Sequence, residues 1–374
     1  MSEQSNEAEY TYDASSIVVL EALEAVRKRP GMYIGGCDEQ ALMATIEGLL
    51  EFMLGLYDRG EVDGATLTVE RPYSLSLELV GVRWQNKCHP QDGRAELELL
   101  LSTLSAGGWK RVSRASLYCF GMPVFNALCS ALRAVHTHGG ETRKWRFKDG
   151  RLIEHEVLSE QPWPETLTFH ATLDPQFFTE CSGIRWTTLV ERVDELMALN
   201  PGMSVQLRDE ASGLTAHCVY PQGIQALLPA SQEEAFTFTL PGPSEFDQLS
   251  IALALRDAEN ATWRSYVEEL QTPKGIHVSQ VRAGIRQAIK DVLKVYPQWE
   301  ARITPSSRGI AAVIQVKLEY TRFNCDRSVL EEGIDNVWVK RAVSLHLTPW
   351  LMASPQRFGQ WASAFQSRKT GEKA

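Results

Sequence analysis

The stretch from Ile46 to Gly121 constrains the fold most strongly, because it sets a helix, an alternating strand and a polar turn in a fixed order. Glu47 and Glu51 are four residues apart on the helix and therefore share one face. The apolar side of this helix carries Leu42, Ile46, Leu49, Leu50 and Met53. Asp38 can cap its N-terminus. Leu75, Leu77 and Leu79 alternate with other residues, as is typical of a strand with one buried face.

Three further segments carry a family pattern. Residues 20–35 read LEALEAVRKRPGMYIG, residues 89–94 read HPQDGR, and residues 272–287 read TPKGIHVSQVRAGIRQ. Together with the Ile46–Gly121 stretch they resemble the ATPase-plus-transducer region of the gyrase B and topoisomerase IV family. The resemblance covers residues 10–370. It implies an α+β fold: a GHKL-type (Bergerat) α/β sandwich followed by a transducer domain similar to ribosomal protein S5 domain 2.

The domain organisation that follows has three parts. Residues 1–9 are acidic and polar and are expected to be a disordered tail. Residues 10–230 form the ATPase-like domain with an N-terminal arm, and residues 231–374 form the transducer-like domain with an exit helix. The segment 232–243, which contains Pro-Gly-Pro, predicts a linker between them. The resemblance also implies that the family's cleavage (TOPRIM) domain is absent from this chain.

The resemblance assigns roles to residues on the helix and strand. Glu47 falls on the family's general base, and Glu51 falls where an asparagine ligates Mg²⁺. Leu79 replaces the aspartate that accepts the adenine amino hydrogen, and Gly81 is the one residue kept from the following turn. Glu51 can still offer Mg²⁺ an oxygen ligand, although ordinary helix charges are the other interpretation of the two carboxylates.

The remaining site positions lie farther along the chain. The glycine-rich lid of the family keeps only Leu117 and Gly121, and a threonine near the adenine becomes Glu165. The transducer lysine that reaches the γ-phosphate falls within residues 326–328, where Arg327 can supply a cation after a shift of one residue. The loss of acceptor, metal ligand and glycine cradle costs about 5–9 kcal/mol on the scale of charge-assisted hydrogen bonds.

Three functions fit these residues. The first is a non-hydrolysing, dimerising interaction or regulatory protein without a nucleotide cofactor. The second is a divergent component of a type II topoisomerase that binds ATP and Mg²⁺ and works with a separate cleavage subunit. The third is a pocket for another small ligand, lined by four aromatic residues that otherwise belong to the core or plug the site: Trp84, Trp109, Tyr118 and Phe120.

The composition limits the cellular compartment and the binding partners that we expect for this protein. The net charge of -9 argues against a broad nucleic-acid surface, although a local basic strip can still contact DNA. Seven cysteines without metal-ligand spacing indicate reduced thiols. No signal peptide or membrane-length apolar run is present. We therefore expect a cytoplasmic, bacterial protein that makes no membrane contact.

Two further expectations concern dimerisation and metal binding. The resemblance implies that residues 10–35 dimerise the chain, with itself or with a genuine gyrase B or topoisomerase IV protein. His136 and His138 are two apart but lack a third ligand, so they predict a surface hairpin and no metal site.

Overall fold

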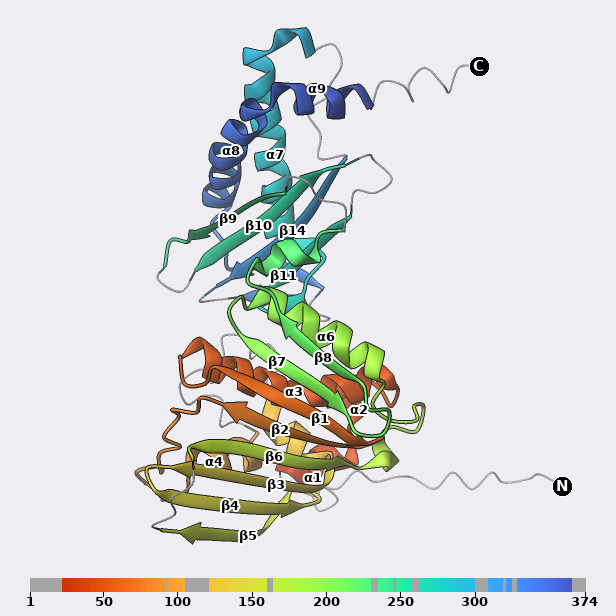
Figure 1. The fold of residues 1–374 in the computed structure, drawn as a ribbon, viewed down its shortest axis with the longest axis vertical. Helices are drawn as coiled ribbons and strands as arrows, with labels where there is room; N and C mark the ends of the chain where they lie inside the picture. Colours follow the sequence, from red (N-terminus) through yellow and green to blue (C-terminus); the bar gives the residue numbers. More distant parts are fainter. Residues whose placement is uncertain are drawn as a thin grey trace, which may run out of the picture.

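Two large mixed sheets organise the molecule, one in each half (Figure 1). The computed structural model describes residues 22–91, 93–104, 121–159, 164–229, 235–244, 247–256, 262–299, 309–318, 321–324 and 328–364. Helices accompany both sheets, in agreement with the α+β expectation. The predicted boundary between residues 230 and 231 lies outside the described residues and stays a prediction.

The first sheet has eight strands in the order β5-β4-β3-β6-β2-β1-β7-β8. Its strands are β1 (Gly64–Arg71), β2 (Ser74–Val80), β3 (Cys129–His138), β4 (Glu141–Lys148), β5 (Arg151–Leu158), β6 (Thr166–Leu173), β7 (Ser204–Asp209) and β8 (Thr215–Val219). β1 and β7 pair in parallel, and the other neighbours pair antiparallel. Leu75, Leu77 and Leu79 of β2 are all buried, which confirms the predicted alternation.

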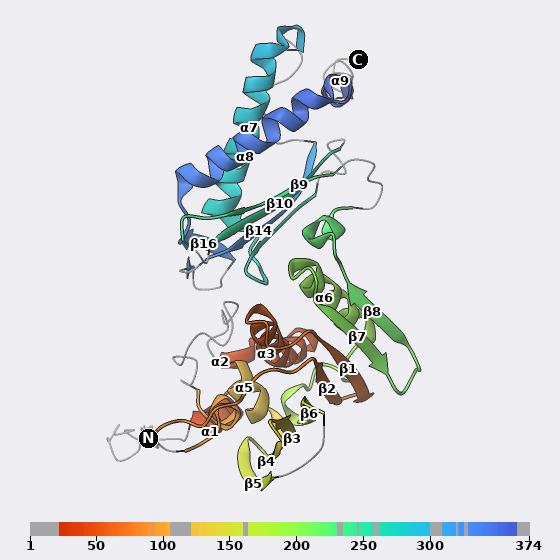
Figure 2. The same ribbon diagram turned by 60° about the vertical axis from the view of Figure 1, so that its left-hand side comes forward.

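Helices of the first domain lie against one face of this sheet. They are α1 (Ala22–Lys28), α2 (Gly31–Ile34), α3 (Glu39–Asp58), α4 (Glu96–Ser102), α5 (Gly121–Ala127) and α6 (Trp186–Leu199), with short 3₁₀ turns η3 (Pro175–Phe177) and η4 (Gly223–Leu227). Figure 2 shows α1, α3 and α5 on the same side of the strands. The core of the domain therefore lies between α3 and the sheet.

α3 forms as its sequence predicts. The Asp38 side chain accepts a hydrogen bond from the backbone N–H of Ala41 at 3.0 Å and so caps the first turn. All five residues of the predicted apolar side are buried, with at most 1 % of each exposed. Burial of this face holds the helix against the sheet and fixes the side from which Glu47 and Glu51 project.

The β4–β5 hairpin turns at Asp149-Gly150, as the Asp-Gly pair predicts. Both residues have positive φ, 51° and 80°, and Lys148 pairs with Arg151 across the two-residue turn. β5 is the edge of the sheet, and Leu152, Ile153 and Val157 on it are 38–55 % exposed.

The second domain is built on a five-stranded sheet in the order β12-β11-β14-β10-β9. Its elements are β9 (Phe236–Pro241), β10 (Gln248–Leu255), β11 (Trp263–Val267), β12 (Leu270–Gln271), β13 (Lys274–Gly275), α7 (Ile276–Val295), η5 (Pro297–Trp299), β14 (Ile310–Lys317), β15 (Arg322–Phe323), β16 (Val329–Glu332), α8 (Asn336–Ala353) and α9 (Pro355–Ala364). β13, β16 and β15 form a small separate sheet. α7 and α8 pack on each other beside the five-stranded sheet (Figures 1 and 2).

The prediction that residues 232–243 form a linker was wrong in part. Residues 236–241 of this segment form β9, which pairs antiparallel with β10 from Phe236↔Leu253 to Pro241↔Gln248. β9 is an edge strand, where the missing N–H of Pro241 costs no ladder bond that the sheet needs.

An apolar cluster joins the two domains. Its buried members are Leu199, Ile224 and Leu228 from the first domain and Ala252, Ala254, Tyr266, Ala311 and Val313 from the second. They come from α6, from η4 and the residue that follows it, and from β10, β11 and β14. Within the described ranges, no helix has the length and apolar character needed to cross a bilayer.

Candidate functional site

α3 presents Glu47 and Glu51 beside the start of α5. A Cβ built on Gly121 would lie 4.0 Å from Glu51 Oε2, so Glu51 and Gly121 face each other as the family pattern implies. A Cβ on Gly48, between the two glutamates, would lie 2.8 Å from the carbonyl oxygen of Gly121. The backbones of α3 and α5 are therefore in direct contact here, and only glycine fits at position 48.

Glu47 is paired with a cation. Its Oε1 accepts a hydrogen bond from Arg192 Nε at 2.6 Å, and both side chains are largely buried, with 16 % and 17 % exposed. Arg192 also donates from Nη1 to Glu195 and from Nη2 to the backbone oxygen of Glu269. Burial lowers the pKa of Arg192, but Glu47 and Glu195 outweigh it, so the net pKa is raised and the guanidinium stays charged.

Arg192 is a site residue that the sequence analysis missed. It lies 145 residues from Glu47, so no local spacing could connect the two. The nearest signal is the i,i+3 spacing of Arg192 and Glu195 within α6. That pair alone is typical of a solvated helix face and indicates nothing about Glu47.

The end of β2 is apolar and filled. Leu79, at the adenine-aspartate position, is 2 % exposed and pairs with Ala65 and Leu167 on the neighbouring strands. Val80 beside it points outward and is 52 % exposed. Leu79 therefore belongs to the hydrophobic core and offers no hydrogen-bond acceptor at this end of the strand.

The backbone conformation at position 81 requires glycine. Its φ is +68°, and a Cβ built on it would lie 2.0 Å from Asp63 Oδ2. Arg83 holds that carboxylate with two hydrogen bonds, of 2.6 and 3.0 Å, and the bonded guanidinium lowers the pKa of Asp63. The turn is thus closed by an Asp63–Arg83 pair.

Substituting Gly81 tests this packing. We expect Gly81→Ala to destabilise the fold by about 1–2 kcal/mol for the positive φ, plus a further loss because the methyl group displaces Asp63. Gly60→Ala is the matched control, since Gly60 has the same φ of +68° and nothing within 4 Å of an added Cβ. Urea unfolding of both variants measures the difference, and equal losses would contradict the proposed crowding at Gly81.

Trp84 belongs to the same core cluster as Leu79. Its ring is 3 % exposed and meets Phe52 edge-on at a centroid distance of 5.5 Å, and Phe52 in turn meets Phe169 at 5.8 Å. For Trp84 the core interpretation is confirmed over the ligand-pocket interpretation. Phe52, one residue after Glu51, thereby links α3 to the filled end of β2.

The surface location predicted for His136 was wrong. It lies on β3 and is 3 % exposed, and its Nε2 donates to the Trp84 carbonyl oxygen at 3.0 Å. Burial lowers its pKa to about 4, so the ring is neutral at pH 7. No group of three metal-ligating side chains occurs among the residues that the structure describes.

The remaining predicted positions separate into two groups. Glu165 is exposed at the start of β6, 3.4 Å from His138 Nδ1. It precedes Thr166 on the strand that pairs with β2, so it lies at the same sheet end as Gly81. Leu117 and Arg327 lie outside the described residues, as do the other three candidate pocket aromatics: Trp109, Tyr118 and Phe120.

A cleft of about 1090 Å³ lies elsewhere, between α1, the β4–β5 turn and η3, and none of the predicted nucleotide positions lines it. Arg27 on its wall donates to the carbonyl oxygen of Ala127 at 2.8 Å and to Asp174 at 3.0 Å. It also lies over the Phe177 ring. Arg27 therefore ties α1 to the domain.

Known proteins are similar to this chain in sequence over most of its length. No family model matches the chain. DNA gyrase B of Streptococcus pyogenes serotype M1 is 28% identical over 325 residues, covering 82% of this chain and 50% of that protein. DNA gyrase B of Streptococcus pneumoniae serotype 4 is 27% identical over 366 residues, covering 92% and 56%. The chain thus spans about half the length of the curated relatives it matches.

Solved structures agree on the fold. The 43K ATPase domain of Thermus thermophilus gyrase B, in complex with an aminocoumarin, superposes with a TM-score of 0.77 at 20% identity, covering 95% of this chain and 97% of that one. The topoisomerase IV ATP-binding domain of Francisella tularensis gives 0.69 at 20%, covering 92% and 96%. The fold expectation is confirmed. Over most of its length, this chain is similar in sequence to DNA gyrase B and has the fold of the gyrase B and topoisomerase IV ATPase region.

Proposed function

We propose that the protein is a non-hydrolysing gyrase-B-like protein that acts as a dimerising interaction or regulatory protein in the bacterial cytoplasm. The observation that carries this proposal is the apolar filling at the end of β2, where Leu79 and Trp84 are 2 % and 3 % exposed. We assign residues 10–230 to the ATPase-like domain and residues 231–374 to the transducer-like domain.

The described residues fit adenosine triphosphate poorly. An adenine amino group needs an acceptor, and Leu79 supplies none. Leu79 and Trp84 also leave almost no exposed surface for a base to stack on. Glu47, at the general-base position, has its carboxylate oxygen bonded to Arg192 at 2.6 Å, so that oxygen is already engaged within the chain. Glu51 keeps oxygen atoms that suit Mg²⁺, and it is the described group that fits best.

Nucleotide titration tests the proposal directly. Isothermal titration with a non-hydrolysable ATP analogue and Mg²⁺ is expected to give no binding heat, because about 10³–10⁶ in affinity is lost with the polar contacts. The ATPase domain of a gyrase B titrated under the same conditions is the positive control. Saturable tight binding would overturn the proposal.

The alternative function is a divergent ATP-binding component of a type II DNA topoisomerase that works with a separate cleavage subunit. Two observations favour it: the relatives are gyrase B proteins, and Glu51 faces Gly121. A steady-state ATPase assay tests it. Turnover that Glu47→Ala abolishes would support this alternative, and an absence of turnover, or turnover indifferent to the substitution, would count against it.

Dimerisation through residues 10–35 belongs to the same proposal. The described part of this segment is α1 and α2, and Met32 on α2 is 74 % exposed. We expect a homodimer, or a heterodimer with a gyrase B or topoisomerase IV protein, without a requirement for nucleotide. Size-exclusion chromatography without nucleotide, comparing the full chain with one that lacks residues 1–20 and keeps the packed helix α1, measures the contribution of the N-terminal part of this segment. The net charge of -9 does not indicate DNA as the partner.

A further inference from the structure

The turn between β11 and β12 carries two buried carboxylates at the junction of the domains. Glu268 and Glu269 are the two residues of this hairpin turn, and they are 1 % and 4 % exposed. Glu268 has a φ of +55°, a conformation that costs free energy for a residue other than glycine. A strained backbone and buried acidic side chains both oppose folding, so the turn has to be stabilised by what surrounds it.

The first stabilising contact comes from α6. Arg192 donates through Nη2 to the backbone oxygen of Glu269 at 3.2 Å while its Nε holds Glu47 at 2.6 Å. Glu195, which accepts from Arg192 Nη1, also accepts from the Tyr266 hydroxyl group on β11. One guanidinium therefore connects α3, α6 and the second domain.

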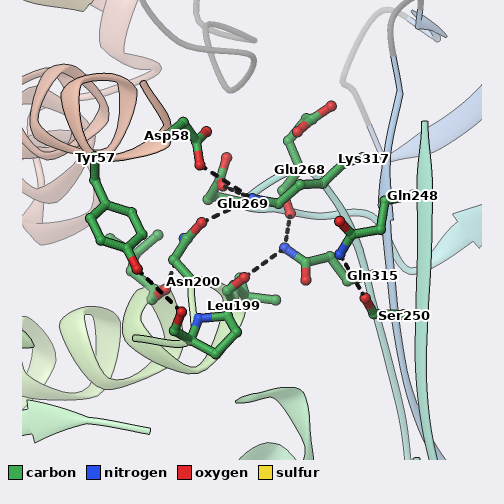
Figure 3. A network of polar contacts seen from close by, with 12 residues as sticks. Tyr57, Asp58, Leu199, Asn200, Gln248, Ser250, Glu268, Glu269, Gln315 and Lys317 are labelled. Carbon is green, nitrogen blue, oxygen red and sulfur yellow. Dashed lines mark hydrogen bonds and ion pairs between the residues drawn. The ribbon is translucent and has the colours of Figure 1, made fainter. Parts of the chain in front are cut away.

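The second contact comes from β14. Lys317 Nζ lies 3.1 Å from Asn200 Oδ1, 3.6 Å from Asp58 Oδ1 and 3.9 Å from Glu269 Oε1. Its side chain is 12 % exposed. Figure 3 shows Lys317 reaching from the second domain towards Asp58 at the end of α3 and Asn200 at the end of α6. A cation of one domain thus meets an anion of the other in a site largely closed to water.

Backbone contacts complete the junction. Gln315 donates to the carbonyl oxygen of Leu199 at 3.1 Å and to that of Glu268 at 3.3 Å. Glu268 Oε1 accepts from the backbone N–H of Leu318 at 2.8 Å. Leu199 belongs to the apolar cluster that joins the domains and also accepts the hydrogen bond from Gln315. The polar contacts therefore lie directly beside this apolar cluster.

We propose that Arg192 and Lys317 form a two-point lock that fixes the second domain on α3 and α6. Glu47 is one end of this lock, so its carboxylate serves domain positioning. The lock holds in the absence of any nucleotide, because every group in it belongs to the chain. The lock is a separate claim from the proposed loss of hydrolysis. It is tested by measuring the geometry of the two domains, and that result does not depend on ATP turnover.

The test removes each positive charge while keeping an unbranched side chain at the position. Arg192→Gln and Lys317→Met are compared with Arg208→Gln, which changes an exposed arginine whose described hydrogen bond goes to Gln206 within its own domain. Hydrogen exchange of the β11–β12 hairpin is expected to accelerate about tenfold or more in each lock variant and not in the control. Small-angle X-ray scattering should show a larger maximum dimension for the double variant.

A charge-exchange variant distinguishes the loss of this ion pair from general unfolding of the protein. In a Glu269→Gln background, which removes the second carboxylate near Lys317 Nζ, Asp58→Lys combined with Lys317→Glu keeps one cation opposite one anion across the junction, and it should restore slow exchange relative to Lys317→Glu in the same background. Circular dichroism checks that each variant is folded. Unchanged exchange and scattering in folded Arg192→Gln and Lys317→Met proteins would overturn the lock, and so would failure of a folded charge-exchange variant to recover.

Discussion

Replacing Glu268 with glutamine is expected to flatten the pH dependence of stability between about pH 4.5 and 8. Burial, reinforced by Glu269, raises the pKa of Glu268 from 4.5 to about 8. In this window the folded protein keeps a proton that the unfolded chain releases. The free energy of unfolding therefore falls as pH rises, by up to about 1.4 kcal/mol per pH unit, and levels off above the folded pKa. Glutamine cannot ionise, so the variant should gain stability relative to wild type as pH rises towards 8.

The charged groups around Glu268 make this the strongest pH effect that we expect. Glu269, whose own pKa is raised by burial, and Asp58 oppose ionisation, while Lys317 favours it. Urea unfolding at pH 5, 6, 7 and 8 measures the slope. Glu180→Gln is the control, because Glu180 is exposed. Parallel curves for Glu268→Gln and wild type would show that Glu268 ionises as an ordinary glutamate.

Replacing Trp84 with alanine is expected to destabilise the first domain by about 3–5 kcal/mol, since a buried tryptophan leaves both lost contacts and a cavity. The ring is 3 % exposed and is fixed between Phe52 and His136. Val80→Ala, at an exposed position close to it in sequence, should cost under about 0.5 kcal/mol.

Denaturant unfolding monitored by circular dichroism measures both variants, because loss of tryptophan changes the fluorescence signal itself. A cost below about 1 kcal/mol for Trp84→Ala would mean that the site has room to collapse or already holds water. That result would also weaken the proposed function, which depends on a filled end of β2.

Periodic features of the fold could be predicted from sequence because they are local. The buried faces of α3 and α6 follow from helical spacing, since Leu189, Val193, Leu196 and Leu199 recur every three or four residues and are all buried. The Asp149-Gly150 turn follows from the need for two positive φ angles. β9 was misinterpreted as linker because proline and glycine at Pro241-Gly242 look the same in a loop and at the end of an edge strand.

The site was predictable only where a motif assigns a position. Leu79 and Gly81 lie at the end of β2 as expected, and Glu51 faces Gly121. The partners of Glu47 could not be found, because Arg192 and the Glu269 carbonyl group are brought to it by the packing of two domains. His136 was misplaced for a similar reason, since its burial depends on Trp84, 52 residues away.

β5 has a consequence for the behaviour of the protein at high concentration. No described strand pairs with the outer edge of β5, and Ile153 and Val157 on this strand are 55 % and 48 % exposed. Such an edge is a template for adding strands from other molecules, which leads to aggregation. Glu154 and Glu156, held by Arg146 and Lys144, place charges along the edge and make that addition costly. We therefore expect Glu154 and Glu156, which take no part in either domain's core, to limit aggregation of the chain at high concentration.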